Sequence, residues 1–206
     1  MNPKDLNKLL GNIDIYLLDQ ILKERFSKDM RILDAGCGEG RNAIYFLNEG
    51  YRIFGIDQEE LGVQYLKYLA KTINPNYELD RFQIAKLEEI PFHDGAFDAI
   101  ICSAVFHFAQ SEKHFFQMLN ELLRVLKLGG IFWFRTCTGF GGILEQGQPI
   151  GKGRFLLPDG SERFVITREI LQQIEELGLK FLEEPKTVLV LDQREMGIFL
   201  MEKLGK

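Results

Sequence analysis

A glycine-rich stretch that begins with an acidic residue is the part of the chain best suited to bind a ligand. Residues 32–42 read ILDAGCGEGRN, so Asp34 ends a short apolar run and Gly36, Gly38 and Gly40 follow at every second position. Glycines permit positive φ and close approach of the backbone, and a helix opening after them would present unpaired N–H groups. The pattern predicts a strand, a nucleotide-binding turn and a helix. A tight turn without a ligand is the alternative.

Carboxylates near this turn indicate which charge the ligand carries. Asp34 and Glu39 would repel a pyrophosphate, and the third glycine comes one residue earlier than in the G-x-G-x-x-G turn of dinucleotide-binding folds. A ligand with an ammonium or sulfonium group would be attracted instead. Asp57 ends a second apolar run about 20 residues further on, where a carboxylate can bind a ribose diol with both oxygens. A helix-capping role for Asp57 is the alternative, and the two roles are compatible.

The glycine turn resembles the first motif of the class I S-adenosylmethionine-dependent methyltransferases, and residues 96–107 (AFDAIICSAVFH) resemble their fourth-strand motif. The resemblance extends over residues 31–206, and within the family it is closest to small-molecule methyltransferases. It implies S-adenosylmethionine as cofactor and in-line methyl transfer to a small-molecule acceptor, with most of the acceleration from orientation. The cofactor-binding residues that it implies are Asp34, Gly36, Cys37, Gly38, Arg41, Asn42, Asp57, Gln58, Lys86, Leu87, Ser103 and Ala104.

One position departs from the family pattern. Residues 85–92 (AKLEEIPF) resemble the segment that encloses the adenine, and Lys86 stands where members commonly have an aspartate. An ammonium cannot accept a hydrogen bond from the adenine amino group. Adenine recognition would then depend on the backbone near Leu87, on apolar packing, or on Glu88.

The acceptor side of the site is predicted from one histidine and a group of arginines. His107 follows the fourth-strand motif at the mouth of the site, where it acts as a base, packs against the acceptor or is purely structural. His93 and His114 are predicted to be surface residues. Residues 135–168 include five basic and three acidic residues, which gives this segment a net charge of +2. The rest of the chain therefore has a net charge of −7.

This charge distribution would draw a small anionic acceptor toward the site. We expect such an acceptor to be bound partly by Arg135, Arg154 or Arg163. The alternative is that these arginines only solvate a mobile loop.

The alternation of strand and helix patterns predicts an α/β fold. We expect a doubly wound, mostly parallel seven-stranded Rossmann-like sheet with helices on both faces and an antiparallel C-terminal strand. The expected helices are 14–26, 41–49, 59–73, a long helix with its N-cap at Ser111, an apolar stripe over 115–126 and its end at 129–130, and 167–177. The expected strands are 31–34, 51–57, 81–85, 97–103, 131–136, 179–182, 187–191 and 196–201, the last two as a hairpin.

Length and composition fit one domain over residues 1–206. Residues 1–30 would form an N-terminal helical cap, in which Tyr16 either reaches the cofactor or packs on its helix. The irregular residues 137–166 would form a substrate lid.

A net charge of −5 argues against nucleic-acid binding. The three cysteines lack metal or disulfide spacing, and no signal peptide or membrane-spanning run is evident. We expect a cytoplasmic monomer or homodimer with no membrane partner. Rival hypotheses are an S-adenosylmethionine-binding domain without methyl transfer and a nicotinamide-dependent oxidoreductase.

Overall fold

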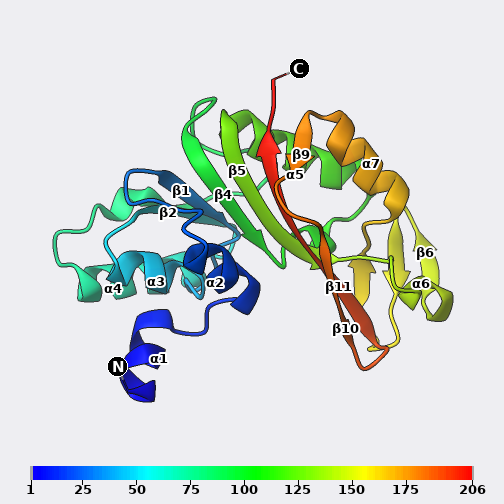
Figure 1. Cartoon of the computed structure of the whole chain (residues 1–206), viewed down its shortest axis with the longest axis horizontal. Helices are drawn as coiled ribbons and strands as arrows, with labels where there is room; N and C mark the ends of the chain where they lie inside the picture. The colour runs from blue at the N-terminus through cyan, green and yellow to red at the C-terminus, as the bar shows by residue number, and fades with distance from the viewer. Residues whose placement is uncertain (1, 206) are drawn as a thin grey trace.

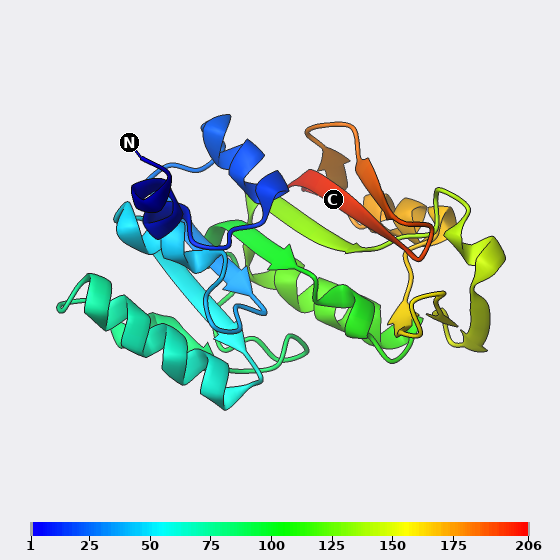
Figure 2. The same cartoon turned by 90° about the horizontal axis from the view of Figure 1, so that it is seen from below.

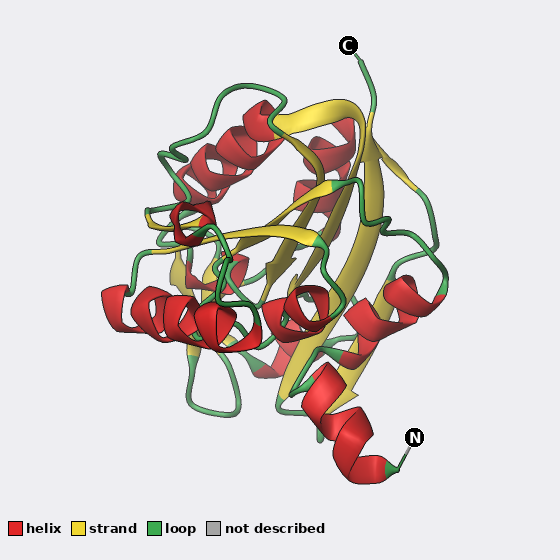
Figure 3. Cartoon of the chain, turned by 90° about the vertical axis from the view of Figure 1, so that its left-hand side faces the viewer, coloured by secondary structure: helices red, strands yellow, loops and turns green. Residues whose placement is uncertain are grey.

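The computed structural model describes residues 2–205 and has helices on both faces of a central sheet (Figures 1 and 3). Its helices are α1 (Pro3–Leu10), α2 (Ile15–Leu22), α3 (Ala43–Asn48), α4 (Glu60–Ile73), α5 (Glu112–Val125), α6 (Ile143–Gln146) and α7 (Arg168–Glu176), with 3-10 turns η1 (Leu79–Arg81) and η2 (Phe106–Phe108). Its strands are β1 (Arg31–Ala35), β2 (Arg52–Asp57), β3 (Phe82–Ile84), β4 (Phe97–Ser103), β5 (Leu126–Cys137), β6 (Gln148–Gly151), β7 (Arg154–Leu156), β8 (Glu162–Phe164), β9 (Leu179–Phe181), β10 (Lys186–Val190) and β11 (Arg194–Lys203).

The central sheet has the order β10-β11-β5-β4-β1-β2-β3, and β9 pairs with β11 as an eighth strand within the described residues. Strands β1 to β5 are parallel, whereas β11 runs antiparallel to β5, β9 and β10. This confirms the predicted doubly wound, mostly parallel sheet with an antiparallel C-terminal strand and a final hairpin. The short β9 corresponds to the expected strand 179–182, and with it the sheet has eight strands rather than seven.

Alternation along the parallel strands divides the core into two layers. In β1, Ile32 packs with the side chains of α2, α3 and α4, whereas the adjacent Leu33 packs with those of α5 and α7. Figures 1 and 2 show these two groups of helices on opposite sides of the sheet. Because successive strand residues point to opposite faces, β1, β2, β4 and β5 bury apolar side chains in both layers.

The structure corrects three predicted boundaries. The helix expected over 14–26 ends at Leu22, and it is preceded by α1, which the apolar pattern could not indicate because α1 buries no side chain. The helix expected to stop at 129–130 ends at Val125. Strand β5 begins directly at Leu126, which pairs with Phe97 of β4 before a register shift.

The segment 137–166 is more regular than predicted. It contains α6 and a three-stranded antiparallel sheet in the order β6-β7-β8. These strands have three or four residues each, and only Phe164 among them is buried, so their sequence has no apolar alternation to detect. Of the described helices, none has the length and apolar character needed to cross a membrane.

Candidate active site

The turn between β1 and α3 brings main-chain groups together with the end of β2. The N–H groups of Gly36 and Cys37 both donate to the carbonyl oxygen of Ile56, at 2.8 and 3.0 Å. Gly36 has a φ of +82°, and a Cβ at this position would overlap Val105. The thiol of Cys37 is buried, and burial raises its pKa above the usual range. The turn therefore presents backbone rather than reactive side chains to the space beside it.

Asp57 ends β2 with both carboxylate oxygens held by the backbone. Oδ2 accepts the N–H of Gly38 at 2.8 Å, and Oδ1 accepts the N–H of Glu59 at 2.9 Å. Since each carboxylate oxygen has two lone pairs, one on each oxygen remains for a ligand. The bond from Glu59 orders the start of α4, so a capping role and a ligand-binding role are compatible.

A cavity of about 670 Å³ opens at the carboxyl ends of β1, β2 and β4. The chain proceeds outward from β1 to β3 on one side and from β4 to β5 on the other, so the cavity lies at the topological switch point of the sheet. The predicted cofactor-binding residues that line it are Gly36, Asp57, Gln58, Lys86, Leu87, Ser103 and Ala104. Its further lining residues are Glu59, Glu88, Val105, Phe108, Gln110, His114 and Met118.

Asp34 is buried at the end of β1 and does not line the cavity. Neither of its carboxylate oxygens has a hydrogen-bond partner within residues 2–205. Burial raises the pKa of Asp34 to about 7; the nearby Arg41 opposes this effect and Asp57 adds to it. A buried carboxylate without a partner is costly unless a cation or donor compensates it.

Arg41 and Asn42 contact the N-terminal segment through Asp14. The Asn42 side chain accepts the N–H of Asp14 at 3.1 Å, and the buried Asp14 carboxylate lies 3.7 Å from Arg41. Arg135 donates to the same carboxylate at 2.8 Å, and Arg41 also donates to the hydroxyl of Ser103 at 3.1 Å. Sequence reasoning missed Asp14, although its position before an apolar helical pattern was a signal for an N-cap, and it does accept the N–H of Tyr16.

His107 lies in η2, buried beside the cavity rather than on its lining. Burial lowers its pKa to about 4, and Arg163, Arg194 and Arg135 add to the effect, so the ring is neutral at pH 7. Its Nδ1 has no hydrogen-bond partner in the described part of the chain. The guanidinium of Arg163 lies 5.0 Å over the ring of Phe108, which is a cavity residue.

Arg154 and Arg163 lie in different surroundings, although both were predicted to bind the acceptor. Arg154 is paired with Glu162 at 2.9 Å across the small sheet, so its charge is already compensated. Arg194, which sequence reasoning missed, is one of the cations that lower the pKa of His107. Arg194 therefore acts on His107 together with Arg163 and Arg135, although it also lies 3.6 Å from Asp159.

His114 was predicted to be a surface residue, and this is wrong. It lines the cavity, and its Nε2 lies 2.7 Å from Oε1 of Glu88, a second lining residue. No local sequence pattern indicated this pair, because the two residues are brought together by the packing of α5 on the turn after β3. His93 is exposed, as predicted. Within residues 2–205 no three His, Cys, Asp or Glu side chains are grouped to hold a metal ion.

Comparison with known proteins agrees with this arrangement. A family model described as a methyltransferase domain matches residues 33–134. The human thiol S-methyltransferase TMT1B is 32% identical over 120 residues, covering 56% of this chain and 46% of that protein. The S-adenosyl-L-methionine-dependent Diels-Alderase iccD of Talaromyces variabilis is 35% identical over 107 residues, covering 50% and 34%. The chain thus spans less than half the length of these curated relatives.

A crystal structure described as a SAM-dependent methyltransferase from Methanosarcina mazei matches 90% of this chain and 98% of that one, with a TM-score of 0.69 and 21% identity. The sheet, the glycine turn and the cavity at the switch point thus define a Rossmann-like methyltransferase fold. The chain belongs to the class I S-adenosylmethionine-dependent methyltransferase family. Its cofactor is S-adenosylmethionine.

Proposed function

We propose that the chain transfers a methyl group from S-adenosylmethionine to a small-molecule acceptor by direct in-line displacement. The cofactor supplies an electrophilic methyl group on a sulfonium centre. The observation that carries the proposal is the Asp57 carboxylate, which two backbone N–H groups fix at the wall of a 670 Å³ cavity. A cavity of this size and place suits a nucleoside ligand.

The residues around the cavity fit this cofactor. Asp57 has a free lone pair on each oxygen and would bind the two ribose hydroxyls. Asp34 is a buried carboxylate without a partner in the described chain, so it would interact favourably with the positive end of the cofactor. Gly36 would allow close approach of the backbone, and Ser103 with Ala104 would form the floor of the pocket. The other predicted cofactor-binding residues either line the cavity or hold the turn.

Orientation rather than acid–base catalysis would supply most of the acceleration, because displacement from a sulfonium needs alignment of the attacking atom. His107 is neutral, and its pKa of about 4 makes it a weak proton acceptor at pH 7. We therefore propose that His107 shapes the acceptor side of the cavity from behind its lining rather than removing a proton.

The proposed acceptor is a small anion. Arg163 covers Phe108 at the cavity, and Arg135 has a buried Nε without a partner among residues 2–205. Both cations lower the pKa of His107, which supports placing them on the His107 side of the cavity. Arg154 is left out of the proposed acceptor site, because it is paired with Glu162 and is not among the cations that lower the pKa of His107.

A second function has one specific observation in its favour. One relative is named a Diels-Alderase that depends on S-adenosyl-L-methionine. In this chain the corresponding function would be to bind the cofactor without methyl transfer. The family match gives no support to a nicotinamide-dependent oxidoreductase.

The test is incubation of the purified chain with methyl-labelled S-adenosylmethionine and a small-molecule extract separated by charge. Methyl transfer to an anionic acceptor predicts S-adenosylhomocysteine together with a labelled product when the anionic fraction of the extract is supplied. Cofactor binding with no S-adenosylhomocysteine above a control without extract would contradict transfer and favour the second function. Label formed only when the cationic or neutral fraction of the extract is supplied as acceptor would contradict the anionic acceptor alone.

A further inference from the structure

Glu88 and His114 form a polar pair on the cavity wall that none of the proposed roles uses. Oε1 of Glu88 lies 2.7 Å from Nε2 of His114, and both residues line the cavity. The Nδ1 of His114 accepts the N–H of Gln110 at 3.0 Å. Because a nitrogen that accepts cannot carry a proton, the proton of the neutral ring lies on Nε2, which donates to Glu88.

The elements on both sides hold this pair in place. His114 lies in the first turn of α5, where its N–H donates to the N-cap hydroxyl of Ser111 at 3.1 Å. Glu88 lies in the turn after β3, which is anchored on α5 by the N–H of Ile90 donating to Glu121 at 3.0 Å. The carboxylate of Glu88 is thus oriented through the bond between its Oε1 and His114, while its Oε2 has no partner among the described hydrogen bonds.

This arrangement compensates for the cation at Lys86. An ammonium cannot accept from an exocyclic amino group, whereas the second oxygen of Glu88 can. We infer that Glu88 accepts the amino group of the cofactor's adenine, and that His114 is a positioning residue that fixes the Glu88 carboxylate. The inference rests on the proposed cofactor binding. It makes Glu88, oriented by a histidine on α5, responsible for base selectivity in place of an aspartate at position 86.

The experiment compares two ligands that differ in the group at the 6-position of the purine. S-adenosylhomocysteine presents an amino group at the purine 6-position, whereas its deaminated analogue, S-inosylhomocysteine, presents an oxygen. Calorimetric titration of the wild type should give a preference for the adenine compound of about tenfold or more, since hydrogen bonds to charged groups have this size.

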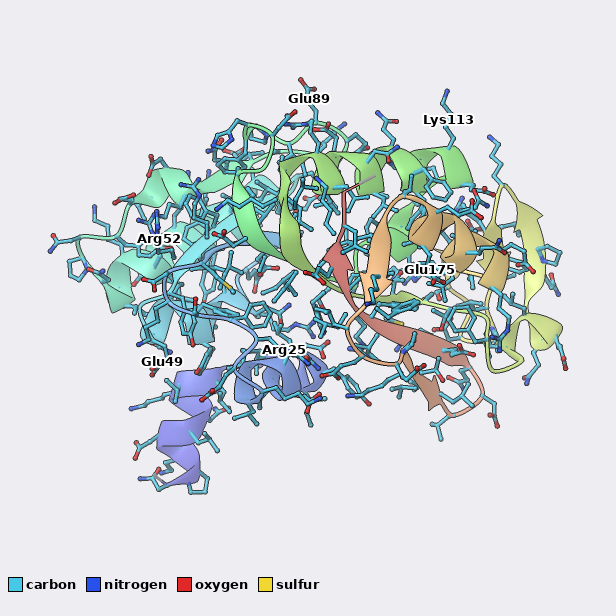
Figure 4. All side chains as sticks on the ribbon, turned by 45° about the horizontal axis from the view of Figure 1, so that its top comes forward. Arg25, Glu49, Arg52, Glu89, Lys113 and Glu175 are labelled. Carbon is cyan, nitrogen blue, oxygen red and sulfur yellow. The ribbon has the colours of Figure 1, made fainter. Side chains whose placement is uncertain are left out.

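The Glu88→Gln variant separates recognition from folding. Its amide oxygen can still accept from His114. The NH₂ group that replaces the second carboxylate oxygen is a donor, so the cavity has a donor where the wild type has an acceptor. The preference should therefore disappear or reverse toward the inosine compound. Glu89→Gln is the matched control, because Glu89 is exposed and projects away from the fold (Figure 4). It should behave like the wild type.

Two further variants test the positioning role. His114→Gln keeps an N–H donor and should retain the adenine preference, whereas His114→Leu removes the donor and should lose most of it. Equal preferences in these two variants would overturn the role of His114. An adenine preference that persists in Glu88→Gln, or is absent from the wild type, would overturn the role of Glu88. A wild type that binds neither compound would instead overturn the proposed function on which the inference rests.

Discussion

Asp57 is the residue on which cofactor binding should depend most. Its two oxygens accept from Gly38 and Glu59 and retain lone pairs toward the cavity. Two charge-assisted bonds to a diol are worth roughly 1.5–3 kcal/mol each. Allowing for partial compensation by water, Asp57→Ala should weaken S-adenosylmethionine binding about tenfold to a thousandfold. Calorimetry on the folded variant measures this, with exposed Asp80→Ala as control, and an unchanged Kd would remove the ribose assignment.

Asp34 should make cofactor binding depend on pH. Its pKa of about 7 means that it is half protonated near neutrality in the free protein. A cation bound next to it favours the carboxylate, so affinity should rise about tenfold between pH 6 and pH 8 and then level off. Titrations across this range check the slope, and Asp34→Asn should flatten it. A wild-type affinity that falls with rising pH would contradict the assignment.

The raised pKa of Asp34 also determines how its contribution to stability changes with pH. The native state of the free protein binds more protons at Asp34 than the unfolded state between pH 3.8, the ordinary value, and about 7. The contribution of Asp34 to stability is therefore fully present below pH 3.8 and is lost as the pH rises through 7. Bound cofactor should reduce this loss.

Residue types and spacing indicated Asp57, the glycine turn and the fourth-strand motif because each of these is local in sequence. Glu88 and His114 are 26 positions apart, and their contact depends on how α5 packs on the turn after β3. Likewise, Asp14 meets Arg135 only after the N-terminal segment has folded over the strand ends. Such contacts are set by tertiary packing, so no local pattern could have predicted them.

At the scale of elements, α2 is joined to the sheet by one buried carboxylate. Asp14 precedes α2 and is paired with Arg135 at 2.8 Å and Arg41 at 3.7 Å. Removal of one partner from a buried pair leaves uncompensated charge, which typically costs about 3–5 kcal/mol. Asp14→Ala should thus lower the melting temperature by roughly 6–20 °C for a domain of this size. Calorimetric melting measures the shift.

Asp19→Ala is the matched control for this prediction. Asp19 lies on the same helix and pairs with Lys23 and Lys186 at the surface. Exposed pairs contribute about 0–1 kcal/mol, so the control should change the melting temperature little. Equal shifts in the two variants would mean that Asp14 does not anchor the N-terminal segment.

Elements with a strong apolar pattern were predicted well. The predicted bounds of the apolar stripe of α5 and of the buried strand β4 are close to the observed bounds, because burial against a sheet face imposes periodicity on the sequence. The strands β6, β7 and β8 carry little buried surface, and their pairing rather than their sequence pattern defines them. The doubly wound architecture was therefore predictable, whereas the small sheet over 137–166 was not.

On the scale of the whole molecule, charge is unevenly distributed. The chain has a net charge of −5, yet Arg135, Arg163 and Arg194 gather beside His107. Once an acceptor is found, Arg163→Gln should raise its KM about tenfold and leave cofactor affinity unchanged, because a charged hydrogen bond is lost. Arg154→Gln is the control, since Glu162 already compensates Arg154.

Added salt should produce a similar rise in the acceptor's KM, because it screens the attraction between the arginines and an anion. Steady-state kinetics at several ionic strengths measure this effect. A KM that is insensitive both to salt and to Arg163→Gln would rule out the anionic acceptor, while methyl transfer itself would stand.

The central claim is that the cavity at the ends of β1, β2 and β4 binds S-adenosylmethionine. Calorimetric titration of the purified chain with S-adenosylmethionine and, separately, with NAD tests it most directly. We predict saturable binding of one S-adenosylmethionine per chain and no heat of binding with NAD, since carboxylates at the turn disfavour a pyrophosphate. Binding of NAD without binding of S-adenosylmethionine would contradict the account.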